Sequence, residues 1–134
     1  MSLTTAFAAW ITTAIAFGAL DALWLSQMVP RFYRPRIGNL LAPRPNMAAA
    51  GAFYLIYVSC LWALAVLPAL ESGGLSRAAL FGGLVGLVAY ATYDLTNHAV
   101  LRGWDLRVAI VDMVWGALAS AIAASAAYTL ASRL

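Results

Sequence analysis

Four long apolar segments occupy nearly all of this 134-residue chain. Each segment is close to the ~20 residues that an α-helix needs to cross ~30 Å of hydrocarbon. With 10% charged residues, the chain falls far below the roughly one-quarter of a soluble domain. We therefore predict an all-α integral membrane protein, one transmembrane domain over residues 1–134, folded as an antiparallel up-down four-helix bundle. The expected helices cover residues 3–28, 47–70, 77–98 and 108–131.

Arginines are concentrated in two connections, the one before and the one after the middle pair of segments. They are Arg31, Arg34, Arg36, Arg44, Arg102 and Arg107. The opposite side carries Arg77 and Arg133, together with Glu71. Because cytoplasmic loops carry the excess of Lys and Arg, we expect both connections in the cytoplasm and both termini outside.

The connection over residues 29–46 holds four of the five prolines and is expected to be a non-helical, basic cytoplasmic loop. Its arginines can attract anionic lipid headgroups at ~1 kcal/mol each, with Phe32 and Tyr33 at the interface. Anchoring to these headgroups is its expected role, and a lid over a cytoplasm-facing site is the alternative. Asn46 and Asp105 are expected to cap the helices that follow them.

Three aspartates fall inside the predicted spans, where a charge at the centre costs ~2.5–3.5 kcal/mol on insertion scales. At ~1.5 Å per residue, Asp21, Asp94 and Asp112 lie ~10, ~6 and ~8 Å from the cytoplasmic ends of their helices. Three helices thus bring a carboxylate to one depth. Three such groups cannot all be ionised cheaply, so we expect at least one to carry a proton unless an arginine or a cation neutralises it.

Other side chains reach the same level. Tyr54 lies seven residues into the second span, and Tyr90, Asn97 and His98 lie four before, three after and four after Asp94 along one helical face. Small residues continue the polar faces of the last two helices and allow close packing, so these faces are expected to point inward. The small residues are Gly82, Gly83, Gly86, Gly116, Ser120 and Ala124.

Two alternatives compete with a ligand site. In the first, the polar groups satisfy one another, and Arg102 or Arg107 reaches down to form ion pairs. In the second, the three aspartates and His98 hold a hard divalent cation, although no Glu-x-x-His pair or paired histidines favour di-iron or haem. The cofactor and the metal therefore remain unknown.

The segments LDALWL, YDLTNHAVLRGW and VDMVWG, in this order and spacing, resemble a family of small bacterial inner-membrane proteins classed as a domain of unknown function, DUF2177. The likeness covers nearly the full chain. It implies the four-helix architecture and a multi-pass location in the bacterial inner (plasma) membrane, and it supplies no activity. The positions that match its pattern are Asp21, Trp24, Tyr93, Asp94, Asn97, Asp112 and Trp115.

The candidate ligand-binding residues are therefore Asp21, Trp24, Tyr54, Tyr90, Tyr93, Asp94, Asn97, His98, Asp112 and Trp115. We expect this carboxylate-rich site to bind or transport a proton, a cation or a polar small molecule or headgroup. One alternative is a lipid-modifying enzyme with an aspartate and His98 as acid–base partners, although no catalytic motif is present. The other is a non-catalytic subunit or stabiliser of a larger membrane complex. The expected partners are membrane lipids and either a second copy of this chain or a larger membrane complex. Nucleic acid is not expected as a partner, because the sequence indicates no aromatic-basic groove.

Overall fold

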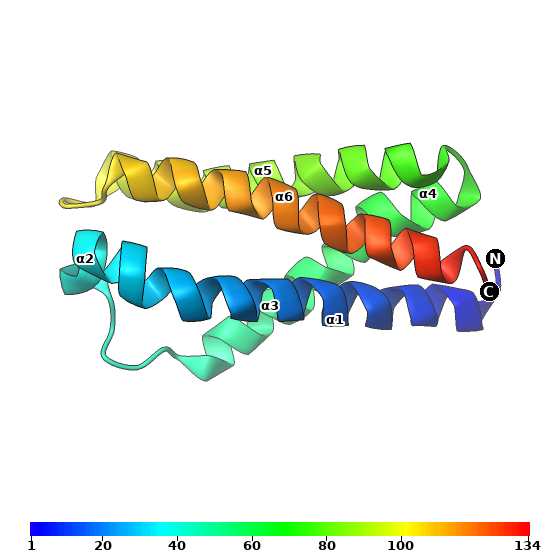
Figure 1. The fold of residues 1–134 in the computed structure, drawn as a ribbon, viewed down its shortest axis with the longest axis horizontal. Helices are drawn as coiled ribbons and strands as arrows, with labels where there is room; N and C mark the ends of the chain where they lie inside the picture. The colour runs from blue at the N-terminus through cyan, green and yellow to red at the C-terminus, as the bar shows by residue number, and fades with distance from the viewer.

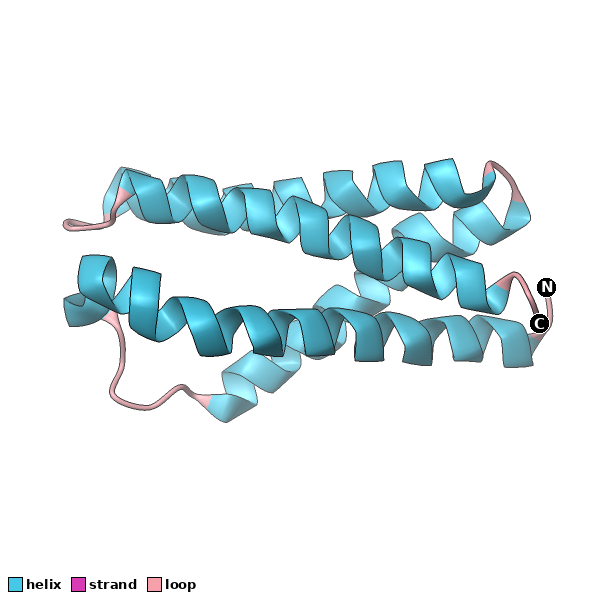
Figure 2. Ribbon diagram, viewed as in Figure 1, coloured by secondary structure: helices cyan, strands magenta, loops and turns pink.

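The computed structural model describes all 134 residues, and its regular structure is entirely helical (Figure 2). Four helical stretches are long and apolar enough to cross a membrane: Leu3–Leu40, Met47–Glu71, Gly74–Val100 and Leu106–Ala131. Both termini lie at the same end of the bundle, so successive stretches run in opposite directions (Figure 1). The predicted all-α four-helix membrane architecture is confirmed.

Capping residues fix where three helices begin. Helix α1 (Leu3–Met28) starts at Ser2, whose Oγ accepts the Thr5 N–H at 3.1 Å. Asn46 caps α3 (Met47–Leu61) by accepting the Ala49 N–H at 3.1 Å. Asp105 caps α6 (Leu106–Ala131) by accepting the backbone N–H groups of Arg107 and Val108, at 2.7 and 3.3 Å. Both caps predicted from the sequence are therefore confirmed.

The first span continues beyond α1, so the expectation of a non-helical loop over residues 29–46 is wrong for its first twelve positions. A wide π-helical turn, η1 (Val29–Tyr33), leads into the short helix α2 (Arg34–Ile37) and a 3₁₀ turn, η2 (Gly38–Leu40). Pro30 and Pro35 occupy the second positions of η1 and α2. Proline has no backbone N–H to donate, and its ring would collide with the preceding turn of a regular α-helix. The wider π-helical turn leaves room for the ring.

The second span also contains a proline inside a helix, near the end of the bundle where the termini lie. Helix α3 leads into a second π-helical turn, η3 (Trp62–Val66), and then into α4 (Leu67–Glu71), which carries Pro68 in its first turn. A tight turn follows, in which Gly73 and Gly74 adopt φ of 91° and 64°. Such values suit glycine because it has no Cβ, and they reverse the chain into α5 (Gly74–Val100).

Helices α5 and α6 approach each other closely through glycines. A Cβ added at Gly82 would lie 2.8 Å from the Ala124 Cβ and 2.8 Å from the Ser120 carbonyl oxygen. One added at Gly86 would collide with the backbone of Gly116. Small residues allow this contact between backbones, which replaces the hydrophobic effect as the source of packing in lipid. The expectation that these faces point inward is met at these positions.

The bundle is tightly packed at the terminal end and more open at the arginine-rich end. Phe17, Leu61 and Val66 form the fully buried core together with alanines of α6. Helix α3 is inclined to the other helices (Figure 1), and most of residues 47–56 are exposed, whereas packing becomes tight from Tyr57 onward. Helix α5 packs mainly against η3, in the second half of this span, and meets α3 near its end, where the rings of Tyr57 and Tyr90 lie edge to face. Space is therefore left between the start of α3 and the pair of α5 and α6.

Candidate functional site

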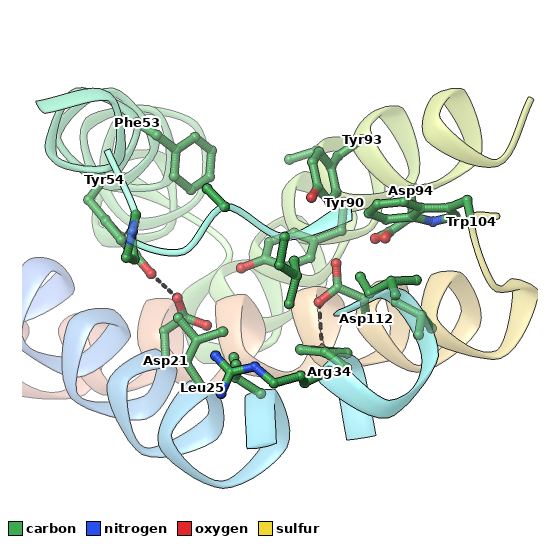
Figure 3. A pocket seen from close by; sticks show the side chains of 18 of the residues that line it. Asp21, Leu25, Arg34, Phe53, Tyr54, Tyr90, Tyr93, Asp94, Trp104 and Asp112 are labelled. Atoms are coloured by element: carbon green, nitrogen blue, oxygen red, sulfur yellow. Dashed lines mark hydrogen bonds between the residues drawn. The ribbon is translucent and has the colours of Figure 1, made fainter. Parts of the chain in front are cut away.

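A cavity of about 590 Å³ lies at the arginine-rich end, between α1, its continuation η1–α2, the start of α3, α5 and α6 (Figure 3). Ligand pockets typically measure ~300–1,000 Å³. Hydrophobic side chains, four tyrosines and a tryptophan among them, make up 13 of the 19 lining residues. The charged lining residues are Asp21, Arg34, Asp94 and Asp112. The three aspartates thus line one cavity, as their depths in the sequence suggested.

Asp21 of α1 is bonded on both oxygens. Its Oδ1 accepts the Trp115 Nε1–H at 3.0 Å, and its Oδ2 accepts the hydroxyl of Tyr54. The aspartate is only 5% exposed. Because buried charge is tolerated where hydrogen bonds satisfy it, Asp21 joins α1 to α3 and α6 and is stable where it lies.

Asp112 of α6 is bonded through Tyr33, which the sequence analysis missed. The Tyr33 hydroxyl donates to the Asp112 Oδ1 at 2.8 Å and accepts the Trp24 Nε1–H, also at 2.8 Å. The indole rings of Trp24 and Trp115 stack, with centroids 4.3 Å apart and planes at 4°. This arrangement holds η1 against α6, so the cavity wall is built partly by the segment that was expected to be a loop.

Tyr33 is 7% exposed, so its side chain faces the interior of the bundle, and its depth relative to the membrane interface stays a prediction. The helical continuation through Pro30 turns Tyr33 inward. A signal was present in the sequence, because four cavity-lining residues follow Asp21 at four-residue intervals, the spacing of one helical face. They are Leu25, Val29, Tyr33 and Ile37.

Asp94 of α5 differs from the other two aspartates. It is 0% exposed, and neither carboxylate oxygen has a hydrogen-bond partner. The Nε1–H of Trp104, another cavity-lining group, is also buried without a partner. Figure 3 shows the Asp94 carboxylate facing the side of the cavity where Asp112 lies. A buried charged group without partners is costly, so this position favours a proton, a cation or a ligand that donates hydrogen bonds.

No arginine neutralises these carboxylates. The one ion pair in the protein joins Arg107 to Asp105 at 2.9 Å, outside the cavity. There, the Arg107 guanidinium holds the pKa of the Asp105 carboxyl below its usual range. Arg102 forms no ion pair, and Arg34 is the only arginine that lines the cavity. The alternative in which Arg102 or Arg107 reaches down to the aspartates is therefore wrong.

The remaining candidates lie in different positions. Tyr54, Tyr90 and Tyr93 line the cavity, whereas Trp24 and Trp115 lie behind its wall and hold other side chains in place. Neither Asn97 nor His98 lines it; His98 is exposed near the end of α5, and Asn97 is half-buried. Their participation in ligand binding stays a prediction.

The side chains do not form a metal site. No group of three His, Cys, Asp or Glu residues is placed so that it could hold a metal ion. Asp21 has both oxygens engaged, and His98 is not part of the cavity wall. The arrangement of these residues therefore favours a ligand held by hydrogen bonds and single charges over a coordinated divalent cation.

These features define a class: a multi-pass, four-helix membrane protein with an acidic cavity inside the helical bundle at its arginine-rich end. The family model described as "Predicted membrane protein (DUF2177)" matches residues 6–129. The chain belongs to this family, as its motifs indicated. No curated protein and no solved structure matches it.

Proposed function

We propose that this protein binds a small amphipathic molecule in the cavity, with the hydrogen-bond-donating or cationic end of that molecule on Asp94 and Asp112. The observation that carries the proposal is the fully buried carboxylate of Asp94, which has no partner and lines a cavity with otherwise largely apolar walls. A carboxylate with two free oxygens can accept several hydrogen bonds, and a bound donor would replace the solvation lost on burial.

This proposal is favoured over a purely structural role for the aspartates. Asp21 and Asp112 do connect helices, through Tyr54, Trp115 and Tyr33. Asp94 lies beside Asp112 and accepts no hydrogen bond from a tyrosine, a tryptophan or an arginine of another helix. A buried carboxyl group that costs free energy and receives no donor from the protein is typical of a binding site, where stability is exchanged for function.

The enzymatic alternative has less support. It required an aspartate and His98 to act as acid–base partners, and His98 is not part of the cavity wall. Proton transfer needs the two groups within hydrogen-bond reach of the same reacting atom. Binding, with or without transport, needs only the cavity and its carboxylates.

The site has a proposed orientation as well. The positive-inside bias favours the arginine-rich end in the cytoplasm of a bacterial inner membrane, where Arg31 and Arg44, both exposed, would meet anionic headgroups. The ligand would then enter from the cytoplasmic side of the bilayer.

Carbodiimide labelling tests this function. Dicyclohexylcarbodiimide is an apolar reagent that modifies carboxyl groups in apolar surroundings, and we expect it to modify Asp94 of the protein in maltoside micelles. Dodecylammonium should slow this modification, and dodecanol, which enters micelles but carries no charge, should slow it much less. Mass spectrometry of the peptides locates the label, and Asp94→Asn gives the background.

The proposal fails if Asp94 is not modified, or if dodecylammonium and dodecanol protect it equally. Asp105 serves as an internal reference, because its carboxyl is ion-paired outside the cavity and should not react with the apolar reagent.

A further inference from the structure

The cavity has an opening toward the side of the bundle. Phe53 of α3 and Tyr93 of α5 both line the cavity, yet they are 45% and 56% exposed. Figure 3 shows them on opposite sides of its upper edge. Leu41, Ala42, Pro43 and Pro45 also line the cavity, so the connection into α3 covers it at the arginine-rich end. A ligand that passes between Phe53 and Tyr93 comes from the bilayer and not directly from water.

The walls of the cavity carry both signs of charge. Arg34 of α2 lines the cavity, is exposed and forms no ion pair. In Figure 3, Asp112 lies between the Arg34 side chain and Asp94. Because the guanidinium has no carboxylate partner, it is free to bind a ligand anion, and a phosphate suits its fork of donors. The carboxylates would hold the cationic part of the same ligand.

We propose that the ligand is a membrane lipid whose headgroup carries a protonated primary amine and a phosphate, held by Asp94 and Asp112 at the amine and by Arg34 at the phosphate. This inference rests on the proposed function and specifies its ligand class. The acyl chains lie along apolar lining residues and leave the cavity between Phe53 and Tyr93. The bound headgroup supplies the donors that Asp94 lacks.

The hydrogen-bond inventory selects a primary amine. An ammonium group has three N–H donors, and Asp94 has two oxygens without a partner. A quaternary ammonium has no N–H donor and could rely only on its charge and on the faces of Tyr90, Tyr93 and Trp104. It would leave the buried carboxylate without hydrogen bonds, so its affinity is expected to be lower.

Native mass spectrometry tests this ligand class. The protein in maltoside micelles is offered an equimolar mixture of phosphatidylethanolamine, phosphatidylcholine and phosphatidylglycerol with identical acyl chains. We expect the ethanolamine lipid to be retained over the choline lipid by about tenfold or more, since tenfold is the lower end of what one hydrogen bond to a charged group contributes. Asp94→Asn should bring this ratio close to one, and Arg34→Gln should weaken retention of the ethanolamine lipid.

Matched controls lie at the opposite end of the bundle. Glu71→Gln and Arg133→Gln change the same charges outside the cavity and should leave the ratio as it is. Circular dichroism of every variant confirms that the helices are intact. Glycerophosphoethanolamine, which has the headgroup without acyl chains, should not compete; full competition would mean a water-soluble ligand and would overturn the lipid assignment.

Two other outcomes also overturn the inference. Equal or stronger retention of phosphatidylcholine would mean that the aromatic rings select the headgroup, and a preference for phosphatidylglycerol would mean that the arginines do. If either occurs while dodecylammonium still protects Asp94 from carbodiimide, the proposed function stands and only the ligand class falls. If that protection is also absent, both fall.

Discussion

Replacing Gly86 by alanine should force α5 and α6 apart. The added Cβ would lie 2.7 Å from the Ser120 Oγ and 2.8 Å from the carbonyl carbon of Gly116, whereas ordinary contact begins at 3.4 Å. The carbonyl belongs to the backbone and cannot rotate away. The Gly116 carbonyl oxygen lies closer still, so the gap from 2.8 to 3.4 Å, about 0.6 Å, is the least that a close-packed helix must move.

The expected loss follows from two opposing terms. Overpacking of this kind costs about 1–3 kcal/mol, and the better helix propensity of alanine returns up to about 1 kcal/mol. We expect a net loss of about 1–2 kcal/mol in the free energy of unfolding. Gly18→Ala is the matched control, because a Cβ there meets nothing within 4 Å and only the propensity gain remains. The two substitutions should thus have opposite signs.

Unfolding in mixed SDS and maltoside micelles, followed by circular dichroism, measures both variants. Gly86 lies on the same face of α5 as Tyr90 and Asp94, at four-residue intervals, so its replacement should also weaken the lipid binding that we propose. If Gly86→Ala proves as stable as Gly18→Ala, the close approach of α5 and α6 is not present, and the placement of Asp94 beside α6 loses its support.

Four further substitutions test which carboxyl and hydroxyl groups stabilise the fold. Asp94→Leu should leave the free energy of unfolding equal to or above that of the wild type, because an unpartnered buried carboxyl is removed, whereas Asp21→Leu should lower it by about 2 kcal/mol or more by leaving two donors unpaired. Tyr33→Phe should lower it by about 1–2 kcal/mol and change the tryptophan fluorescence spectrum, because Trp24 loses its acceptor. Asp105→Asn should be less stable than the wild type at neutral pH only. The pKa of Asp105 is lowered in the folded protein, so its carboxylate stabilises the protein at pH values above the ordinary carboxyl pKa. This stabilisation is lost as the pH falls through the lowered pKa. Acid titration of both proteins, followed by circular dichroism, checks this last expectation.

The architecture was predictable because the bilayer fixes the length of a spanning helix. Apolar length gave the four helices, and Asn46 and Asp105 marked helix starts through their side-chain oxygens. The continuation past α1 was not predictable from proline alone. Pro30 interrupts an α-helix, yet a single widened turn absorbs it at small cost when the segment beyond can pack. Here Tyr33 and Ile37 pack, so the helix continues.

The depth of each aspartate was predictable, because a helix rises by a constant length per residue. The state of each aspartate was not, because it depends on partners from distant parts of the chain. Tyr33 is 79 positions from Asp112, and Trp115 is 94 positions from Asp21. The position of His98 was harder to predict for a different reason: one helical turn brings it near Asp94 along the axis, but at the end of α5 it is exposed and lies outside the cavity wall.

Helices α1 and α6 carry the same D-x-x-W pattern, Asp21 with Trp24 and Asp112 with Trp115. In the structure, the tryptophan of each antiparallel helix contributes to the hydrogen bonding of the aspartate in the other helix. Trp115, from the pattern in α6, donates to Asp21 in α1, and Trp24, from the pattern in α1, acts on Asp112 through Tyr33. Each pattern therefore satisfies the aspartate of the other. In α5, the position three residues after Asp94 is Asn97 and not a tryptophan. Asn97 donates to neither oxygen of Asp94, and no tryptophan donates to them either. The three aspartates therefore share one cavity but differ in their hydrogen bonds: Asp21 and Asp112 accept donors from other helices, whereas Asp94 accepts none.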